Sequence, residues 1–310
     1  MKTEDSNNYV IDDYNIFKLA KNIKYEAPNC IILFWNIYNM NSWLLLIYCK
    51  CKKIKIIYWS HGMSLQDPNN KLKKLIYNTF QLFSDSILLY SPNEMKYIPT
   101  CLHSKTFIAN NTINFDEIPQ IEVSKSDIKK EFNLGYDKIV LFVGRIQKRK
   151  RLDILLDIFK NRKDSNIGLV IVGSGFSEDY QRMVKNNYNI EYLGEIYDKI
   201  KINMLFKCAD IFCIPGTNGL GVNQAMYWGL PVLALNVNHS PEIYYLKNGV
   251  NGYIVNSSKE LENKMFSILN DENQLKKLSE NAYKIIRKEA SVNNMFNGFM
   301  NSINFFKTTI

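Results

Sequence analysis

The chain has 310 residues, of which 46% are apolar, enough for one large or two medium domains with a sizeable core. Its formal net charge of +9 suits an anionic ligand, an acidic membrane surface or nucleic acid, and does not choose among them. Six cysteines with one close pair and only three histidines argue against a zinc site, and no apolar run is long enough to span a membrane.

The first part of the chain alternates apolar and amphipathic stretches from about residue 30 to residue 114. It follows a polar, acidic stretch, MKTEDSNNY, that does not resemble a secretory signal. Ser91-Pro92-Asn93-Glu94 is typical of a helix start, because serine caps well and proline fits the first turn. We expect strands at 31–36, 54–60, 86–91 and 106–111, and helices at 42–50 and 71–83.

The second part, after a polar stretch at 116–138 that we interpret as the join between domains, alternates more regularly. Strands this apolar, separated by helices, indicate a parallel sheet covered on both faces, with ligands at the carboxyl ends of the strands. We expect strands at 138–144, 167–175, 190–194, 211–214, 231–235 and 252–255, and helices at 151–160, 178–185, 199–207 and 220–228, with another starting at Ser240 and a helical stretch from about 260.

The segment Gly144 to Arg151 directly follows an expected strand and carries five cations within 145–151. Arginine binds phosphate oxygens with a planar fork and lysine adds a point charge, so a phosphate site is one interpretation. A solvated charged turn is equally compatible with this composition. A nucleic-acid patch is disfavoured, because no aromatic residues interleave with the cations.

Two glycine turns also follow expected strands: Gly173-Ser174-Gly175 and Gly219-Leu220-Gly221. The second precedes a helix, whose free amides and dipole favour a phosphate. Each turn could instead serve packing alone. The first lacks a full dinucleotide fingerprint, and the sequence GK[ST] of a P-loop occurs nowhere.

His61 stands at the end of an expected strand in Trp59-Ser60-His61-Gly62. A lone histidine is more often structural than catalytic, but its place at a strand end favours a functional role. Neither a serine–histidine–aspartate arrangement nor a carboxylate pair stands out.

Taken together, VGRIQKRKRLDILL, LVIVGSG, IEYLG, KCADIFCIPGTNGLGVNQAMYWGLPVLA and SPEIYYLKNGVNGYIV resemble, in order and spacing, the C-terminal half of family 4 glycosyltransferases. The match covers about residues 136–290. IKIIYWSHG, SILLYSPNE and FIANNTIN are similar to parts of the N-terminal half, less distinctively. The resemblance implies the α/β GT-B fold, with two Rossmann-like parallel-sheet domains facing across a cleft: a reduced acceptor-side domain at 1–118, a linker at 119–135, a sugar-nucleotide domain at 136–290, and a helix at 291–310 that packs back on the first domain.

The same resemblance implies a donor site. Arg145 and Lys150 match a basic pair on the donor diphosphate, and His61 matches a histidine near the donor sugar; these three form the predicted catalytic set. Glu195 and Ile196 fall in a loop that frames the base. The predicted donor site comprises Gly144, Gly173, Glu195, Ile196, Gly216, Asn218, Gly219, Leu220, Gly221 and Gln224. The sugar nucleotide is a co-substrate, and neither a metal nor another cofactor is expected.

Three departures from the family pattern stand out. Gly216 and Gln224 occupy positions where most members have glutamates, one holding sugar hydroxyls and one the ribose. Arg151 stands where a glycine is usual. The first 29 residues contain no glycine, although the family normally opens with a glycine-rich loop. Either the chain is a shortened member or its acceptor side is built differently.

The resemblance predicts a retaining glycosyltransferase that moves a hexose-type sugar from a UDP- or GDP-sugar to a glycan or lipid-linked acceptor in surface polysaccharide synthesis. The alternative is an inactive relative that binds nucleotide or a partner glycosyltransferase, and a third, weaker one is a sugar-nucleotide epimerase. No nucleic-acid partner is expected.

We expect a cytoplasmic protein. Peripheral contact with an anionic membrane is a further hypothesis, because four lysines follow the apolar stretch Trp43–Tyr48. A core helix followed by a solvated lysine turn is the stronger interpretation of that stretch. The lysines concerned are Lys50, Lys52, Lys53 and Lys55.

Overall fold

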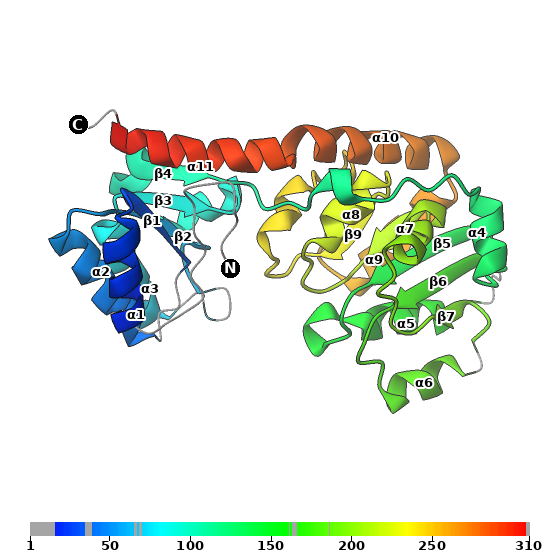
Figure 1. Ribbon diagram of the computed structural model, residues 1–310. Coiled ribbons are helices and arrows are strands. Elements are labelled where there is room, and N and C mark those ends of the chain that lie inside the picture. Colours follow the sequence, from blue (N-terminus) through cyan, green and yellow to red (C-terminus); the bar gives the residue numbers. More distant parts are fainter. Residues whose placement is uncertain are drawn as a thin grey trace. The chain divides into compact units, whose positions relative to one another are not determined.

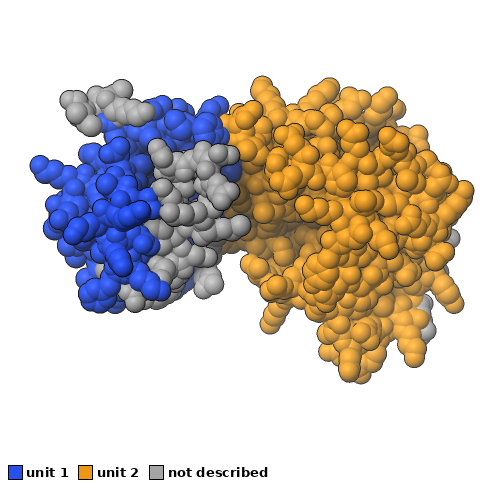
Figure 2. All heavy atoms as spheres, in the orientation of Figure 1, with its two compact units in different colours: residues 1–110, 295–310 blue, residues 111–294 orange. Residues whose placement is uncertain are grey.

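The computed structural model describes residues 16–34, 39–64, 67, 70–160, 162, 166–185 and 187–307. The chain divides into two units, one formed by residues 1–110 with 295–310 and the other by residues 111–294 (Figures 1 and 2). The stretch 119–135, expected as a linker, falls inside the second unit and contains α4 (Lys125–Glu131). The N-terminal stretch MKTEDSNNY and the end of the expected strand 31–36 lie outside the described residues.

The first unit is built on a parallel sheet of four strands in the order β1-β2-β3-β4. This sheet confirms the α/β class predicted for the first part of the chain. The strands are β1 (Cys30–Phe34), β2 (Lys55–Trp59), β3 (Ser86–Leu89) and β4 (Thr106–Ile108).

Helices cover both faces of this sheet. Successive side chains of a strand point to opposite faces, so neighbouring residues of β2 pack against different helices. Ile56 and Tyr58 of β2 pack into a cluster with α1 (Ile16–Glu26), α2 (Met40–Cys51) and α3 (Lys71–Phe83). Ile57, between them, packs into a different cluster with α11 (Val292–Lys307). The first unit therefore has three layers, and the third comes from the far end of the chain.

Two contacts fix α11 on the first unit. The hydroxyl oxygens of Ser86 and Ser302 are buried and lie 2.6 Å apart. Gly298 allows the helix to approach closely, because a Cβ there would lie 2.1 Å from the carbonyl oxygen of Ile108. After β3 the chain forms two short 3-10 helices, η1 (Pro92–Tyr97) and η2 (Thr100–Lys105), in place of the regular helix predicted from Ser91.

The second unit has a parallel sheet of six strands in the order β10-β9-β8-β5-β6-β7. The chain leaves β5 (Lys138–Val143) toward β6 and leaves β8 (Ile211–Cys213) toward β9, so the order reverses between these two neighbours. A crevice forms at the carboxyl ends of strands where the order reverses. The remaining strands are β6 (Ile167–Val172), β7 (Ile190–Tyr192), β9 (Val232–Leu235) and β10 (Gly252–Val255).

Helices pack on both faces of this sheet around one large apolar core (Figure 1). Many begin with a capping side chain that accepts a backbone hydrogen bond: Ser124, Ser177, Asp198, Ser257 and Asp271. The helix expected at Ser240 is a 3-10 turn. Besides α4, the helices are η3 (Phe115–Glu117), η4 (Lys148–Lys150), α5 (Leu152–Lys160), α6 (Glu178–Val184), α7 (Lys199–Cys208), α8 (Gly221–Tyr227), η5 (Pro241–Tyr245), α9 (Ser258–Leu269) and α10 (Glu272–Glu289).

Candidate functional site

A pocket of about 330 Å³ lies in the second unit at the carboxyl ends of β5 and β8. Two loops supply its walls, the cationic loop that follows β5 and the glycine loop between β8 and α8. It is lined by Val143, Gly144, Arg145, Gln147, Arg149, Lys150, Ile214, Gly219, Leu220 and Gly221. Six of the predicted site residues are therefore brought together: Gly144, Arg145, Lys150, Gly219, Leu220 and Gly221.

The cations of this pocket are not neutralised. Within the described part of the chain, no carboxylate forms an ion pair with Arg145, Arg149 or Lys150. Burial lowers the pKa of Lys150, the neighbouring Arg149 lowers it further, and Glu242 opposes both effects. Three cations that face one pocket without a paired anion make a site for an anionic ligand.

Arg151 ends the cationic loop in the left-handed conformation, with φ at 55°. Glycine adopts this conformation without the strain that a Cβ causes. The resemblance places a glycine at this position, and the backbone geometry gives the physical reason. The side chain of Arg151 turns to Asp153, 3.4 Å away, so its charge is partly offset.

Gly216 joins the two loops by backbone contacts. Its N–H donates to the carbonyl oxygen of Lys150 at 2.9 Å, and the N–H of Thr217 donates to that of Arg149 at 2.8 Å. A Cβ on Gly216 would lie 2.0 Å from the oxygen of Arg149. The glycine in place of a glutamate is therefore a packing requirement of this chain.

Hydrogen bonds of Asn218 and His239 stabilise the glycine loop. Asn218 is 1% exposed, and its amide nitrogen donates to the carbonyl oxygens of Ile214 at 2.9 Å and Gly216 at 3.1 Å. The backbone N–H of Asn218 donates to Nδ1 of His239 at 3.2 Å, while Nε2 of His239 donates to Leu235 O at 2.8 Å. Asn218, predicted as a donor contact, supports the loop instead of lining the pocket.

This arrangement requires a neutral His239. Burial is the largest cause that lowers its pKa, and Lys150 contributes in the same direction, against the hydrogen bond to Leu235. Sequence reasoning missed His239, because the motif recognised beside it begins only at Ser240.

The backbone amides of Gly219, Leu220 and Gly221 donate to no other described residue. They lie at the wall of the cationic pocket. Amides in this position add hydrogen-bond donors to the positive charge.

Gly173 packs against Gly144, one of the residues that line the pocket. A Cβ on Gly173 would lie 2.1 Å from the carbonyl oxygen of Gly144, so the two turns pack backbone to backbone. The hydroxyl of Tyr192 donates to the carbonyl oxygen of Gly173 at 2.9 Å. The packing interpretation of this turn accounts for its contacts.

Glu195 and Ile196 follow β7 and do not line the pocket. The carboxylate of Glu195 accepts from the hydroxyl of Tyr197, which is itself exposed. Their predicted role in framing the base stays a prediction.

His61 belongs to the first unit, at the end of β2. Its Nδ1 lies 2.7 Å from Oε1 of Glu94, and its ring stacks on Tyr90 with centroids 4.5 Å apart. Oε2 of Glu94 accepts from the N–H groups of Tyr90 at 2.8 Å and Ser91 at 3.1 Å. Since a carboxylate accepts, Nδ1 carries the proton and Nε2 is left available. The sequence signalled Glu94 only as part of a helix start.

Gln224 lies on α8, one turn beyond Gly221. Its amide nitrogen donates to Oδ1 of Asn203 at 3.1 Å, and Nε1 of Trp228 donates to the same oxygen at 2.7 Å. Asn203 is a second residue that sequence reasoning missed.

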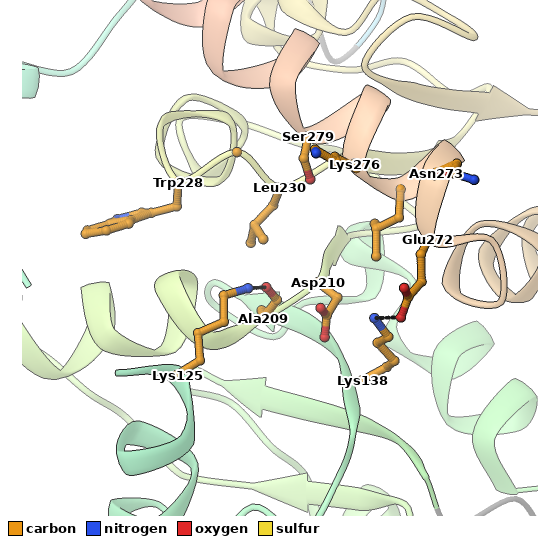
Figure 3. A pocket seen from close by; sticks show the side chains of 12 residues that line it. Lys125, Lys138, Ala209, Asp210, Trp228, Leu230, Glu272, Asn273, Lys276 and Ser279 are labelled. Carbon is orange, nitrogen blue, oxygen red and sulfur yellow. Dashed lines mark hydrogen bonds and ion pairs between the residues drawn. The ribbon is translucent and has the colours of Figure 1, made fainter. Parts of the chain in front are cut away.

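A second pocket, of about 490 Å³, lies at the opposite edge of the sheet, where β5 and β8 begin (Figure 3). Lys138 pairs with Glu272 at 3.9 Å, and Nζ of Lys125 donates to Ala209 O at 3.3 Å. Its lining carries charges of both signs, including the Lys138–Glu272 pair, so the smaller cationic pocket fits an anionic ligand better.

No group of three or more metal-binding side chains forms among the described residues. All six cysteines are free thiols. Among the helices that the structure describes, none is long and apolar enough to cross a membrane.

Two relatives are an uncharacterized 41.2 kDa protein in the cps region of Klebsiella pneumoniae, 29% identical, and an uncharacterized glycosyltransferase of Methanocaldococcus jannaschii, 28% identical. The matches cover 66% and 74% of this chain and 58% and 62% of the relatives, so the chain spans about six tenths of their length.

Solved structures resemble the whole chain. Anabaena HepE in complex with UDP aligns with a TM-score of 0.76 and 15% identity, over 93% of this chain and 81% of that one. A glycosyltransferase from Rickettsia africae aligns with a TM-score of 0.76 and 18% identity, over 99% and 84%. At such identities the likeness shows the fold, an α/β fold of the GT-B type.

The model of one protein family, described as glycosyl transferases group 1, matches residues 124–285. This range contains the cationic loop, the glycine loop and the pocket between them. The chain belongs to the glycosyl transferases group 1 family.

Proposed function

We propose that the protein is a glycosyltransferase that takes its sugar from a nucleoside-diphosphate donor held in the second unit. The observation that carries the proposal is the cationic pocket at the strand reversal, where Arg145, Arg149 and Lys150 face a loop of free amides. Related structures contain UDP and UDP-glucose, which supports this class of ligand.

The chemistry follows from charge. When the sugar leaves, negative charge develops on the diphosphate, and fixed cations and amide dipoles stabilise it most in the transition state. Arg145 and Lys150 would carry most of this effect, without a metal ion. We propose retention of configuration by a front-face route, in which the leaving phosphate assists deprotonation of the acceptor.

His61 and Gln224 would contact the rest of the donor. Nε2 of His61 is available for a sugar hydroxyl, because Nδ1 is engaged by Glu94. Gln224 would accept from the ribose. Gly216 offers no side chain, so its contribution is limited to its backbone.

For the acceptor we propose a glycan or a lipid-linked oligosaccharide, used in surface polysaccharide synthesis in the cytoplasm. A relative encoded in a cps region supports this context. The donor sugar is proposed to be of the hexose type, carried by UDP or GDP.

We further propose peripheral contact with an anionic membrane, through α3. In the stretch first suggested for this role, Leu45 and Leu46 of α2 are buried, whereas Leu44 and Ile47 are exposed. Lys50 and Lys55 are both paired with Asp85. The α3 helix instead exposes apolar side chains at helical spacing beside exposed lysines: Leu72, Leu75 and Leu82, with Lys71 and Lys74.

Flotation on vesicles tests this contact. The protein should float with vesicles that contain anionic lipid, and the double variant Leu72→Ser/Leu75→Ser should float less. Tyr188→Ser, at an exposed aromatic residue of the second unit, is the control. Equal flotation of the double variant would move the contact away from α3.

A non-catalytic relative that binds nucleotide is the second candidate, favoured by the missing glutamates at 216 and 224. One experiment separates the two. A thermal-shift screen of UDP- and GDP-sugars identifies a ligand, since binding raises the melting temperature in line with affinity. Donor hydrolysis or transfer is then followed with the best ligand. Binding without turnover supports the second candidate, and no binding of any sugar nucleotide refutes both.

A further inference from the structure

The side-chain amide of Gln224 is hydrogen-bonded to Asn203, which Trp228 contacts in turn, and neither residue belongs to a loop of the pocket. Asn203 of α7 is 3% exposed and lies between Gln224 and Trp228. The inference drawn from these three side chains rests on the proposed function.

Two neighbouring groups independently fix the orientation of the Asn203 side-chain amide. The indole nitrogen of Trp228 can only donate, so the atom 2.7 Å from it must be the oxygen of Asn203. The carbonyl of Lys199 can only accept, so the atom 2.7 Å from it must be the nitrogen of Asn203. Both neighbours require the same orientation of the Asn203 amide.

The orientation of Gln224 follows. The oxygen of Asn203 accepts, so the atom of Gln224 that lies 3.1 Å from it must be the amide nitrogen. The carbonyl oxygen Oε1 of Gln224 therefore points the other way. No described residue donates to Oε1, and it is not among the buried oxygens that lack a partner, so it is accessible.

Gln224 also lies on the appropriate face of α8. Leu220 and Gly221, which line the cationic pocket, share the less buried face of this helix with Gln224. Val222 and Asn223 are fully buried on the other face. An accessible acceptor stands one helical turn from the pocket wall.

We propose that Asn203 and Trp228 are positioning residues that keep the carbonyl oxygen of Gln224 turned outward, where it accepts a hydrogen bond from a ribose hydroxyl of the donor. A glutamate at 224 would not be equivalent. One of its carboxylate oxygens would face Oδ1 of Asn203, and two acceptors would then be opposed in a partly buried place. The chain thus supports a neutral acceptor at this position.

The test measures discrimination between ribonucleotides and deoxyribonucleotides. Dissociation constants of UDP and GDP, and of their 2′-deoxy and 3′-deoxy forms, are determined by calorimetry. The wild type should prefer the better ribonucleotide to one deoxy form by about fivefold, the contribution of one neutral hydrogen bond. Gln224→Ala should abolish this preference, and Asn203→Leu should reduce it below about twofold.

Three further variants complete the experiment. Trp228→Phe removes the indole N–H alone and should reduce the preference partly, and it keeps the test open if Asn203→Leu does not fold. Gln224→Glu should bind the ribonucleotide more weakly than the wild type. Asn189→Leu, which removes another buried amide of the second unit, hydrogen-bonded to Arg162 O at 3.0 Å, should keep the full preference.

The outcomes are separable. A wild type that binds neither nucleoside diphosphate refutes the proposed function. A preference that persists in Gln224→Ala, or in both Asn203→Leu and Trp228→Phe while their melting temperatures fall, overturns the inference and leaves the proposed function standing. A wild type that binds both deoxy forms as tightly as the ribonucleotide also overturns it.

Discussion

One carboxylate oxygen of Glu94 lies 2.7 Å from Nδ1 of His61, and the other accepts hydrogen bonds from two backbone N–H groups. Because those N–H groups can only donate, the carboxylate cannot turn away from the imidazole. The tautomer of His61 is thereby set by a residue that is itself buried.

Glu94→Gln should reverse this tautomer. The oxygen of the new amide must face Tyr90 and Ser91, so its NH₂ group must face His61, whose Nδ1 then accepts and whose Nε2 carries the proton. We expect a folded protein whose kcat falls by roughly tenfold or more, because a misplaced proton removes the acceptor at Nε2. Nitrogen-15 NMR of the imidazole reports the tautomer directly. An unchanged kcat in a variant with the reversed tautomer would remove His61 from the reaction.

Gly216→Ala should destabilise the protein by about 2 kcal/mol, since its Cβ would overlap the carbonyl oxygen of Arg149. Donor affinity should fall with it, because the cationic loop must shift. Gly135→Ala is the matched control: a Cβ at Gly135 meets no atom within 4 Å. Urea unfolding of both variants measures the difference, and equal stabilities would contradict the close approach. For the same reason Gly216→Glu is not expected to restore the usual family contact.

Arg145→Ala should weaken binding of the sugar nucleotide by about tenfold to a hundredfold, the loss of one charge-assisted contact. Lys148→Ala provides the comparison. Lys148 is an exposed cation of the same loop and does not line the pocket. Titration calorimetry with the best donor gives both affinities. If the two variants lose affinity equally, the loop acts through its overall charge and not through the pocket.

The glycine loop should become less stable in mild acid. The pKa of His239 is lowered in the folded protein. As the pH falls below the ordinary histidine pKa of about 6.5, His239 is therefore protonated in the unfolded chain before it is protonated in the folded protein. This contribution to stability is complete above that value and is lost as the pH falls from it through the lower pKa of the folded protein. Urea unfolding between about pH 5 and pH 8 should show the loss, and His239→Gln, which has no ionisable group, should show a smaller one. Identical pH profiles would mean that His239 is not held neutral.

The sequence predicted the sheets well, because parallel strands buried on both faces are continuous apolar runs such as Ile167–Val172. It placed the cationic loop and the glycine loop at strand ends, because each follows an apolar run, and both loops line one pocket. The donor roles of Arg145 and Lys150 came from the family resemblance and stay predictions. The sequence could not predict Asn203 or His239, since their roles arise from side chains that meet only in the folded chain. The sequence also could not predict that the helices after Ser91 and Ser240 are 3-10 helices, because the same capping residues start α-helices and 3-10 helices.

The first unit is formed by two separate parts of the chain, residues 1–110 and 295–310, and the ribosome makes the second part last. The face of β2 and β3 that carries Ile57 and Leu88 is covered by residues from Met295 onward. All of the second unit is translated before those residues, so it can fold while the first unit still exposes an apolar face. During that interval the nascent chain should bind chaperones through this face, and translation past α11 should release them.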